Sequence, residues 1–331
     1  MSELVGAAAI RAAADRLRGV IIPTPLLPAP WLDEELGAEV RLKCENLQRA
    51  GAFKIRGAYN AVASLTDQER ARGVIAYSSG NHAQGVALAA KLFDIRAVVV
   101  MPTTAPRVKM DGARALGAEV VLEGTTSVER QTRAEAIAAE DGLTIIPAFD
   151  DPRTIAGQGT VGLEIAEAWP EVQVVVVPVG GGGLISGIAA WIRHALPECR
   201  VIGVEPEHAN AMQQSMAAGH PVTIAPHVSV ADGLMPVRPG DLTVAHALAH
   251  VDEIVTVSDD AIVEATALLL QKSKLVVEFS GAATVAALRS GVIDTRGLRV
   301  AAVLSGGNLD PIRALELLAA RGEPPPSLPA V

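Results

Sequence analysis

Four consecutive glycines, Gly180–Gly183, follow the apolar segment Val172–Val179 and precede a stretch with helical periodicity. A segment that is apolar at successive positions must be covered on both faces, as a central strand of a parallel sheet is. Four glycines allow a tight turn that directs several N–H groups to one point, ahead of the positive end of a helix. The sequence therefore predicts a phosphate site here, with an ordinary strand-to-helix turn as the simpler alternative.

Two common nucleotide-binding loops do not match this segment. The dinucleotide spacing G-x-G-x-x-G fails because Ile185 or Ser186 stands where its third glycine is required. The mononucleotide loop fails because Ile188 stands where its lysine is required. A loop without that lysine suits a single terminal phosphate held by backbone amides, and pyridoxal phosphate is one cofactor of this kind.

Short runs rich in β-branched residues alternate along the chain with Ala-rich stretches of helical length. The alternation predicts an α/β protein with parallel sheets and helices on both faces. Because so many strands fit two sheets better than one, we expect two doubly wound lobes with a site between them. We assign residues 1–72 and 150–331 to a large domain and residues 73–149 to a small domain. The expected strands are Val74–Ser79, Ala97–Pro102, Glu119–Glu123, Thr144–Ala148, Val172–Val179, Arg200–Glu205, Glu253–Val257 and Arg299–Leu304.

The charge and cysteine content narrow the classes of partner. A net charge of −9, with no Lys/Arg-rich run to offset it, argues against nucleic acid. No apolar run approaches the roughly 20 residues that span a bilayer, so we expect no membrane partner. Cys44 and Cys199 lie far apart and form no Cys-x-x-Cys motif, so we expect reduced core residues of a cytoplasmic protein.

Lys54 follows a glycine-containing turn at the start of a helical pattern. A lysine on a helix is usually a solvated charge, and that is the simpler interpretation. Its neighbours Ala52, Phe53 and Ile55 would instead remove the amine from water and lower its pKa, as a Schiff-base lysine requires.

Four segments occur here in one order: Asn46–Ala58, Ser78–His82, Gly180–Gly183 and Leu304–Asn308. Together they resemble the serine/threonine dehydratase and serine racemase family, from about residue 20 to about residue 315. The resemblance implies the second fold type of pyridoxal phosphate enzymes, which is similar to the β subunit of tryptophan synthase. It also implies bound pyridoxal 5'-phosphate, a small hydroxy-amino-acid substrate, and a homodimer or homotetramer.

The resemblance assigns roles residue by residue. Lys54 matches the catalytic lysine that holds the cofactor covalently, Phe53 the residue packed on the pyridine ring, and Ser305 the partner of the ring nitrogen. The remaining cofactor-binding residues would be Asn81 at the ring 3-hydroxyl, Gly180, Gly181, Gly182, Gly183 and Leu184 at the phosphate, and Glu278. The residues expected at the substrate carboxylate are Ser78, Ser79, Asn81 and His82, next to a helix start.

These roles imply β-elimination from L-threonine or L-serine to a 2-oxo acid and ammonia, with Lys54 taking the α-proton. A serine at the ring nitrogen stabilises a pyridinium weakly, which favours prompt loss of a leaving group over transamination. A serine racemase is one alternative, with Ser79 as a catalytic base rather than a carboxylate ligand. A 3-hydroxyaspartate dehydratase is another, because Phe279 and Gln131 depart from the family pattern. A non-catalytic binder of phosphometabolites is the distant alternative.

A cation site is doubtful. In the family a divalent cation such as magnesium often binds through a glutamate, a backbone carbonyl and a second acid. Glu205 and Ala209 match the first two, but Ala211 replaces the second acid and removes charge that a hard cation requires. His246 and His250 have helical metal spacing, but they lack the adjacent glutamate of a zinc protease.

Overall fold

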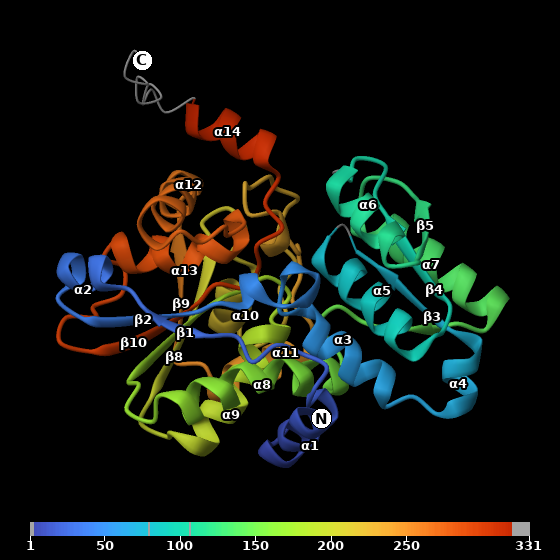
Figure 1. The fold of residues 1–331 in the computed structure, drawn as a ribbon, viewed down its shortest axis with the longest axis horizontal. Coiled ribbons are helices and arrows are strands. Elements are labelled where there is room, and N and C mark those ends of the chain that lie inside the picture. Colours follow the sequence, from blue (N-terminus) through green and yellow to red (C-terminus); the bar gives the residue numbers. More distant parts are fainter. Residues whose placement is uncertain (1–2, 79, 106, 320–331) are drawn as a thin grey trace.

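The structure is a computed structural model that describes residues 3–78, 80–105 and 107–319. These residues form two separate sheets, each with its own helices. Figure 1 shows the two sets of strands and helices side by side. We call the six-stranded sheet with its helices the six-stranded unit, and the other sheet with its helices the four-stranded unit. The predicted α/β class with parallel sheets is confirmed. The exact domain limits at residues 72 and 150 stay a prediction.

The six-stranded sheet has the order β1-β2-β10-β7-β8-β9. Its strands run parallel except for β1, which pairs antiparallel with β2 at one edge. Successive residues of the central strand face opposite ways: Val174 and Val176 join one apolar core, Val175 and Val177 the other. The strands are β1 (Leu26–Pro28), β2 (Glu39–Lys43), β7 (Val174–Pro178), β8 (Arg200–Pro206), β9 (Glu253–Val257) and β10 (Arg299–Val303).

Helices cover both faces of this sheet, as the apolar character of β7 on both sides requires. One core includes α2, α12 and α13, and the other includes α1, α8, α9 and α11. The helices of the six-stranded unit are α1 (Ala7–Leu17), α2 (Pro30–Leu36), α8 (Pro152–Ala168), α9 (Gly183–Ala195), α10 (Ala211–Ala218), α11 (Asp241–His250), α12 (Asp259–Leu268), α13 (Phe279–Arg289) and α14 (Pro311–Ala319). Short helical turns are η1 (Glu45–Leu47), η2 (Arg49–Gly51), η3 (Asp232–Leu234) and the π-helical η4 (Leu269–Ser273).

The four-stranded sheet has the order β5-β4-β3-β6 and is parallel throughout. Its strands are β3 (Val74–Tyr77), β4 (Ala97–Met101), β5 (Glu119–Leu122) and β6 (Thr144–Ile145). The helices of this unit are α3 (Lys54–Ala63), α4 (Asp67–Arg72), α5 (Asn81–Phe93), α6 (Arg107–Ala115) and α7 (Ser127–Asp141). Figure 1 shows α3 between the two sheets, where it packs on α5 and on α8.

Glycines bring α3 and α8 close enough to join the two units. A Cβ built on Gly57 would lie 2.8 Å from the carbonyl oxygen of Thr154, and one on Gly157 would lie 2.5 Å from that of Arg56. Any side chain at either position would push the helices apart. The helix that begins at Lys54 is therefore held at backbone contact distance from the six-stranded unit.

Two further sequence expectations, on the strands and on the cysteines, are met in the described part of the chain. All eight predicted strands are present, most of them shorter by a few residues than expected. Cys44 and Cys199 are free and buried. No helix in the described ranges is both long and apolar enough to cross a bilayer.

Candidate active site

Lys54 is placed by the strand end that carries Ser305. Ala52 forms an isolated antiparallel bridge with Gly306, and the backbone N–H of Phe53 donates to the carbonyl oxygen of Ser305 at 3.1 Å. Ser305 itself is buried just after β10. These contacts tie the first turn of α3 to the carboxyl end of the six-stranded sheet, where open α/β sheets bind their ligands.

The Lys54 amine is a perturbed base. Its Nζ donates to the carbonyl oxygen of Ala148 at 3.0 Å and lies 5.1 Å from the centroid of the Phe53 ring. Removal from water lowers the pKa of Lys54 to about 8, against the opposing effect of the Glu278 carboxylate. A substantial fraction of the amine is therefore neutral near pH 8 and able to act as a nucleophile or base.

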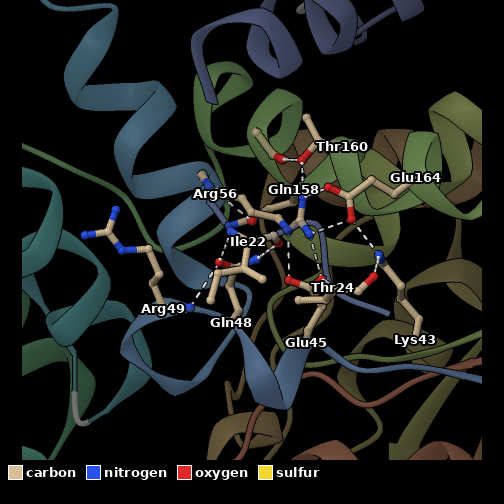
Figure 2. Close-up of polar contacts among 12 residues, drawn as sticks. Ile22, Thr24, Lys43, Glu45, Gln48, Arg49, Arg56, Gln158, Thr160 and Glu164 are labelled. Carbon is tan, nitrogen blue, oxygen red and sulfur yellow. Dashed lines mark hydrogen bonds and ion pairs between the residues drawn. The ribbon is translucent and has the colours of Figure 1, made fainter. Parts of the chain in front are cut away.

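A buried cluster of charges fixes α3 two residues beyond Lys54 (Figure 2). Arg56 donates to both carboxylate oxygens of Glu45, at 2.8 and 2.7 Å, and to both of Glu164, at 2.6 and 2.8 Å. Lys43 adds a fourth charge, with its Nζ 2.5 Å from Glu164 Oε2. Two cations thus balance two carboxylates between β2, η1, α3 and α8, which sets the rotation of the helix that carries Lys54.

Asn81 and Glu278 meet from opposite units. Asn81 Nδ2 donates to Glu278 Oε1 at 2.5 Å, and Asn308 Nδ2 donates to Asn81 Oδ1 at 2.9 Å. A Cβ on Gly306 would lie 2.2 Å from Glu278 Oε1, so only glycine leaves room for this carboxyl group. Burial raises the pKa of Glu278 to about 7, against the lowering effect of Lys109. Glu278 Oε2 is buried without a hydrogen-bond partner.

The predicted substrate residues begin α5 and precede it. The Ser78 hydroxyl accepts from the Gly80 N–H at 3.3 Å, and Asn81 is the first residue of the helix. His82 Nε2 lies 2.8 Å from the carbonyl oxygen of Ile146, while its Nδ1 is buried without a partner. Burial, reinforced by the positive charge of Lys54, lowers the pKa of His82 to about 3, so the ring is neutral. Ser79 lies outside the described residues.

The glycine loop is as tight as the sequence predicts. Gly182 has a φ of +94° and directly precedes α9, of which Gly183 and Leu184 are the first residues. A Cβ on Gly181 would lie 2.2 Å from the Phe149 ring, and one on Gly182 would lie 2.4 Å from Met212 Cε. The first N–H groups of an α-helix lack partners within the helix, so they are available to an anion.

The residues on these elements fit pyridoxal phosphate. The amine of Lys54 is largely removed from water, as a group that condenses with an aldehyde requires. The loop excludes every side chain but hydrogen and leads into a helix N-terminus, which suits a terminal phosphate. Glu278 Oε2 and His82 Nδ1 are buried polar atoms without a hydrogen-bond partner, and such atoms usually have one. Both side chains lie within the electrostatic reach of Lys54.

The residues expected at the cation site do not suit a divalent cation. Both oxygens of Glu205 accept backbone N–H groups at the start of α10, from Met212 at 2.9 Å and Gln213 at 2.8 Å. Burial raises the pKa of Glu205 to about 8, so the carboxyl group is largely protonated at neutral pH. Ala209 is buried nearby and Ala211 supplies no carboxylate. In the described ranges no cluster of three His, Cys, Asp or Glu side chains is arranged to hold a metal.

The histidine pair on α11 has a structural role instead. His246 Nε2 accepts from the backbone N–H of Val5 at 3.0 Å, which ties the N-terminal segment to α11. Its ring centroid lies 5.8 Å from that of His250.

Sequence reasoning missed two features of the site. Thr243 Oγ1 donates to the Gly181 carbonyl oxygen at 2.7 Å, and Asp150 accepts the N–H groups that begin α11, so both support the glycine loop. Lys109 lies among the acidic groups of the site and pairs with Asp232. No local pattern distinguishes Lys109 from a solvated lysine on an amphipathic helix. Asp150 accepts from a helix that begins 91 residues later, so no local capping signal could have indicated its role either.

Comparisons with known proteins agree with this geometry. A family model described as pyridoxal-phosphate dependent enzyme matches residues 17–306. The L-threonine ammonia-lyase of Thermotoga maritima is 47% identical over 301 residues, which are 91% of this chain and 75% of that protein. The L-threo-3-hydroxyaspartate ammonia-lyase of a Pseudomonas species is 42% identical over 298 residues, 90% of this chain and 93% of that protein. The solved structure of maize serine racemase superposes with a TM-score of 0.92 at 35% identity, covering 96% of this chain and 98% of its own.

Proposed function

This chain belongs to the family of pyridoxal-phosphate-dependent enzymes, and from that premise we propose that it is an ammonia-lyase acting on L-threonine or L-serine. It would remove the β-hydroxyl group and release a 2-oxo acid and ammonia. The observation that carries the proposal is the Lys54 amine, which donates to the Ala148 carbonyl oxygen at 3.0 Å, lies within the electrostatic reach of Glu278 and has its pKa lowered to about 8 by removal from water. The high identity to an L-threonine ammonia-lyase supports this choice of chemistry.

We assign the cofactor contacts to residues already described. Lys54 would hold the aldehyde carbon, Phe53 would cover the ring, and Ser305 would face the ring nitrogen. Asn81, supported by Glu278, would bind the ring hydroxyl, and Gly180, Gly181, Gly182, Gly183 and Leu184 would bind the phosphate. When bound, pyridoxal phosphate supplies an electron-withdrawing ring that stabilises negative charge at the substrate α-carbon.

Different side chains of the protein would transfer the proton and orient the substrate. The neutral Lys54 amine would take the proton from the substrate α-carbon, a transfer that its lowered pKa favours near neutral pH. Ser78, Asn81 and His82, at the start of α5, would orient the substrate carboxylate against the positive end of that helix. Ser305 offers a hydroxyl rather than a carboxylate to the ring nitrogen, which supports elimination over transamination.

A second candidate is elimination from 3-hydroxyaspartate. The relative from Pseudomonas, 42% identical over most of its length, carries that activity in its name. Serine racemisation is a third candidate, supported by the likeness to maize serine racemase, and would assign Ser79 as a base.

We place the enzyme in the cytoplasm because its two thiols are free and buried. We expect a homodimer or homotetramer, which light scattering of the purified protein would measure.

The test uses the purified protein and its Lys54→Ala variant. We expect the wild type to be yellow and to bleach with borohydride, and the variant to lose covalently held cofactor. Release of 2-oxo acid would then be followed with L-threonine, L-serine, D-serine and L-threo-3-hydroxyaspartate, and D-serine formation from L-serine would be measured in parallel. A colourless wild type that ignores added cofactor, or full turnover by Lys54→Ala, would contradict the proposal.

A further inference from the structure

Lys109 and Asp232 join the two units at the edge of the active site. Lys109 belongs to α6 of the four-stranded unit, and Asp232 begins η3 of the six-stranded unit, 123 residues later in the chain. Lys109 Nζ donates to Asp232 Oδ2 in a close ion pair. The Lys109 side chain is only 7% exposed, whereas that of Asp232 is 46% exposed. The pair therefore has one end inside the protein and one at its surface.

The buried end of the pair touches the substrate side of the site. A Cβ on Gly80 would lie 3.2 Å from Lys109 Nζ, so the ammonium group lies against the residue that precedes α5. Glu278, which accepts from Asn81, also lies within the electrostatic reach of Lys109. Lys109 is thus the cation that faces both the start of α5 and the acidic partner of Asn81.

The exposed end of the pair, at Asp232, lies beside the glycine loop (Gly180–Gly183). A Cβ on Gly180 would lie 2.8 Å from the carbonyl oxygen of Gly233, the residue after Asp232. The Gly233 N–H donates to Ser280 Oγ on α13 at 2.9 Å. Just upstream, Asp259 accepts from Ser229 Oγ and from the Val230 N–H, at 2.6 and 3.0 Å. The segment that carries Asp232 is therefore anchored to the six-stranded unit rather than free to follow Lys109.

We propose that the Lys109–Asp232 ion pair holds the four-stranded unit closed over the glycine loop, and we call this pair the latch. Lys109 is also a positioning residue for the start of α5. Closure of this kind excludes water and completes a site assembled from two bodies. The kinetic part of the inference rests on the proposed function. The structural part does not, because it concerns how the two units meet.

The test compares four variants of the cofactor-loaded protein: Lys109→Gln, Asp232→Asn, the double variant, and Lys109→Arg as the conservative change. Hydrogen exchange is followed in α6 and in the first turn of α5, without substrate. We expect each of the first two variants to exchange at least about tenfold faster there, with β3 and β4 unchanged. The double variant should exchange no faster than Lys109→Gln, because either single substitution already removes the whole ion pair. Lys109→Arg should keep most of the protection.

Kinetics supply the second measurement. An open site should raise the KM about tenfold or more in Lys109→Gln and in Asp232→Asn, with a smaller fall in kcat. Additive effects of the two substitutions, or unchanged exchange in α6, would overturn the latch. Because Asp232 is nearly half exposed, Asp232→Asn is expected to fold even if a change at Lys109 is not tolerated. Exchange is measured without turnover, so an enzyme acting on another amino acid would contradict the proposed function and leave the latch standing.

Discussion

Arg56 and Glu45 form a two-pronged ion pair, with N–O distances of 2.8 and 2.7 Å, at a place where neither side chain is exposed at all. Burial alone would raise the pKa of Glu45, but the Arg56 guanidinium, with smaller contributions from Lys43 and Thr24, more than offsets this and lowers it. Arg56 lies two residues after Lys54, on the side of α3 that packs against α8. The orientation of Lys54 therefore depends on a charge cluster centred two residues further along α3.

Arg56→Met should destabilise the protein by about 3–5 kcal/mol, because it leaves Glu45 buried without its cation. Urea unfolding of the variant and the wild type measures the loss in free energy of unfolding. Arg96→Met is the matched control, because Arg96 also pairs with two carboxylates, Glu119 and Asp141, but on the surface. Arg96→Met should lower the free energy of unfolding by no more than about 1 kcal/mol. Equal losses in the two variants would show that burial of the Arg56 cluster is unimportant.

Gly182→Ala should weaken cofactor binding as well as stability. Its φ of +94° disfavours any Cβ, and that Cβ would also lie 2.4 Å from Met212 Cε and 2.8 Å from Thr243 Cβ. Gly219 is the matched control, since it has a φ of +75° but open space around it. We expect Gly219→Ala to lose about 1 kcal/mol of stability and keep its cofactor. Gly182→Ala should release pyridoxal phosphate on dialysis, and retention of full cofactor absorbance would contradict the assignment of the loop.

Glu278 should make the cofactor-free protein less stable as the pH rises. The folded-state pKa is about 7, against 4.5 in the unfolded chain, so the folded protein binds more protons between these values. Its stability must then fall across that window, by on the order of 3 kcal/mol for this group. Glu278→Gln cannot lose a proton and should be stabilised relative to wild type more at pH 8 than at pH 4.5.

Thermal unfolding of the two apoproteins at both pH values measures this difference. His82 is neutral in the folded protein throughout this window, because its pKa there is about 3, but in the unfolded chain it titrates near 6.5. That contribution is present in both proteins and cancels from the comparison. Lys54 begins to lose its proton in the folded protein as the pH approaches 8, so a third measurement at pH 7, where it is mostly protonated, isolates the Glu278 contribution. A stability difference that is independent of pH would mean that the Glu278 carboxyl is not held protonated.

Local patterns drew attention to the glycine loop and to Lys54, while the roles of Asn81, Glu278 and Ser305 rest on the family resemblance. A glycine run after an apolar strand and a lysine among apolar neighbours are visible within a few residues. Strands β1 and β2 were missed, since Leu26–Pro28 is very short and Glu39–Lys43 alternates with charged residues. The Lys109–Asp232 and Arg56–Glu164 pairs join residues 123 and 108 positions apart. Only the folded topology brings such charges together, so no spacing rule could have indicated them.

Ala211→Asp should create a response to magnesium that the wild type lacks. In the wild type the Glu205 carboxyl group accepts two N–H groups from α10 and has a pKa of about 8, so it offers little charge to a cation. An aspartate at position 211, the first residue of α10, would add a second carboxylate next to Glu205. Two acidic oxygen donors are a better match to the preference of a hard cation. At a concentration ten times its Kd, magnesium should stabilise the variant by about 1.4 kcal/mol.

Thermal unfolding at pH 8.5, with magnesium chloride or with EDTA, measures this response in both proteins. Ala211→Asn is the matched control, because it adds a polar side chain of the same shape without the charge. We expect neither the wild type nor Ala211→Asn to shift its Tm between the two conditions, while Ala211→Asp should rise with magnesium and return to its starting value with EDTA. A wild type that loses stability in EDTA would mean that Glu205 already binds a cation, and that the N–H groups of α10 do not replace one.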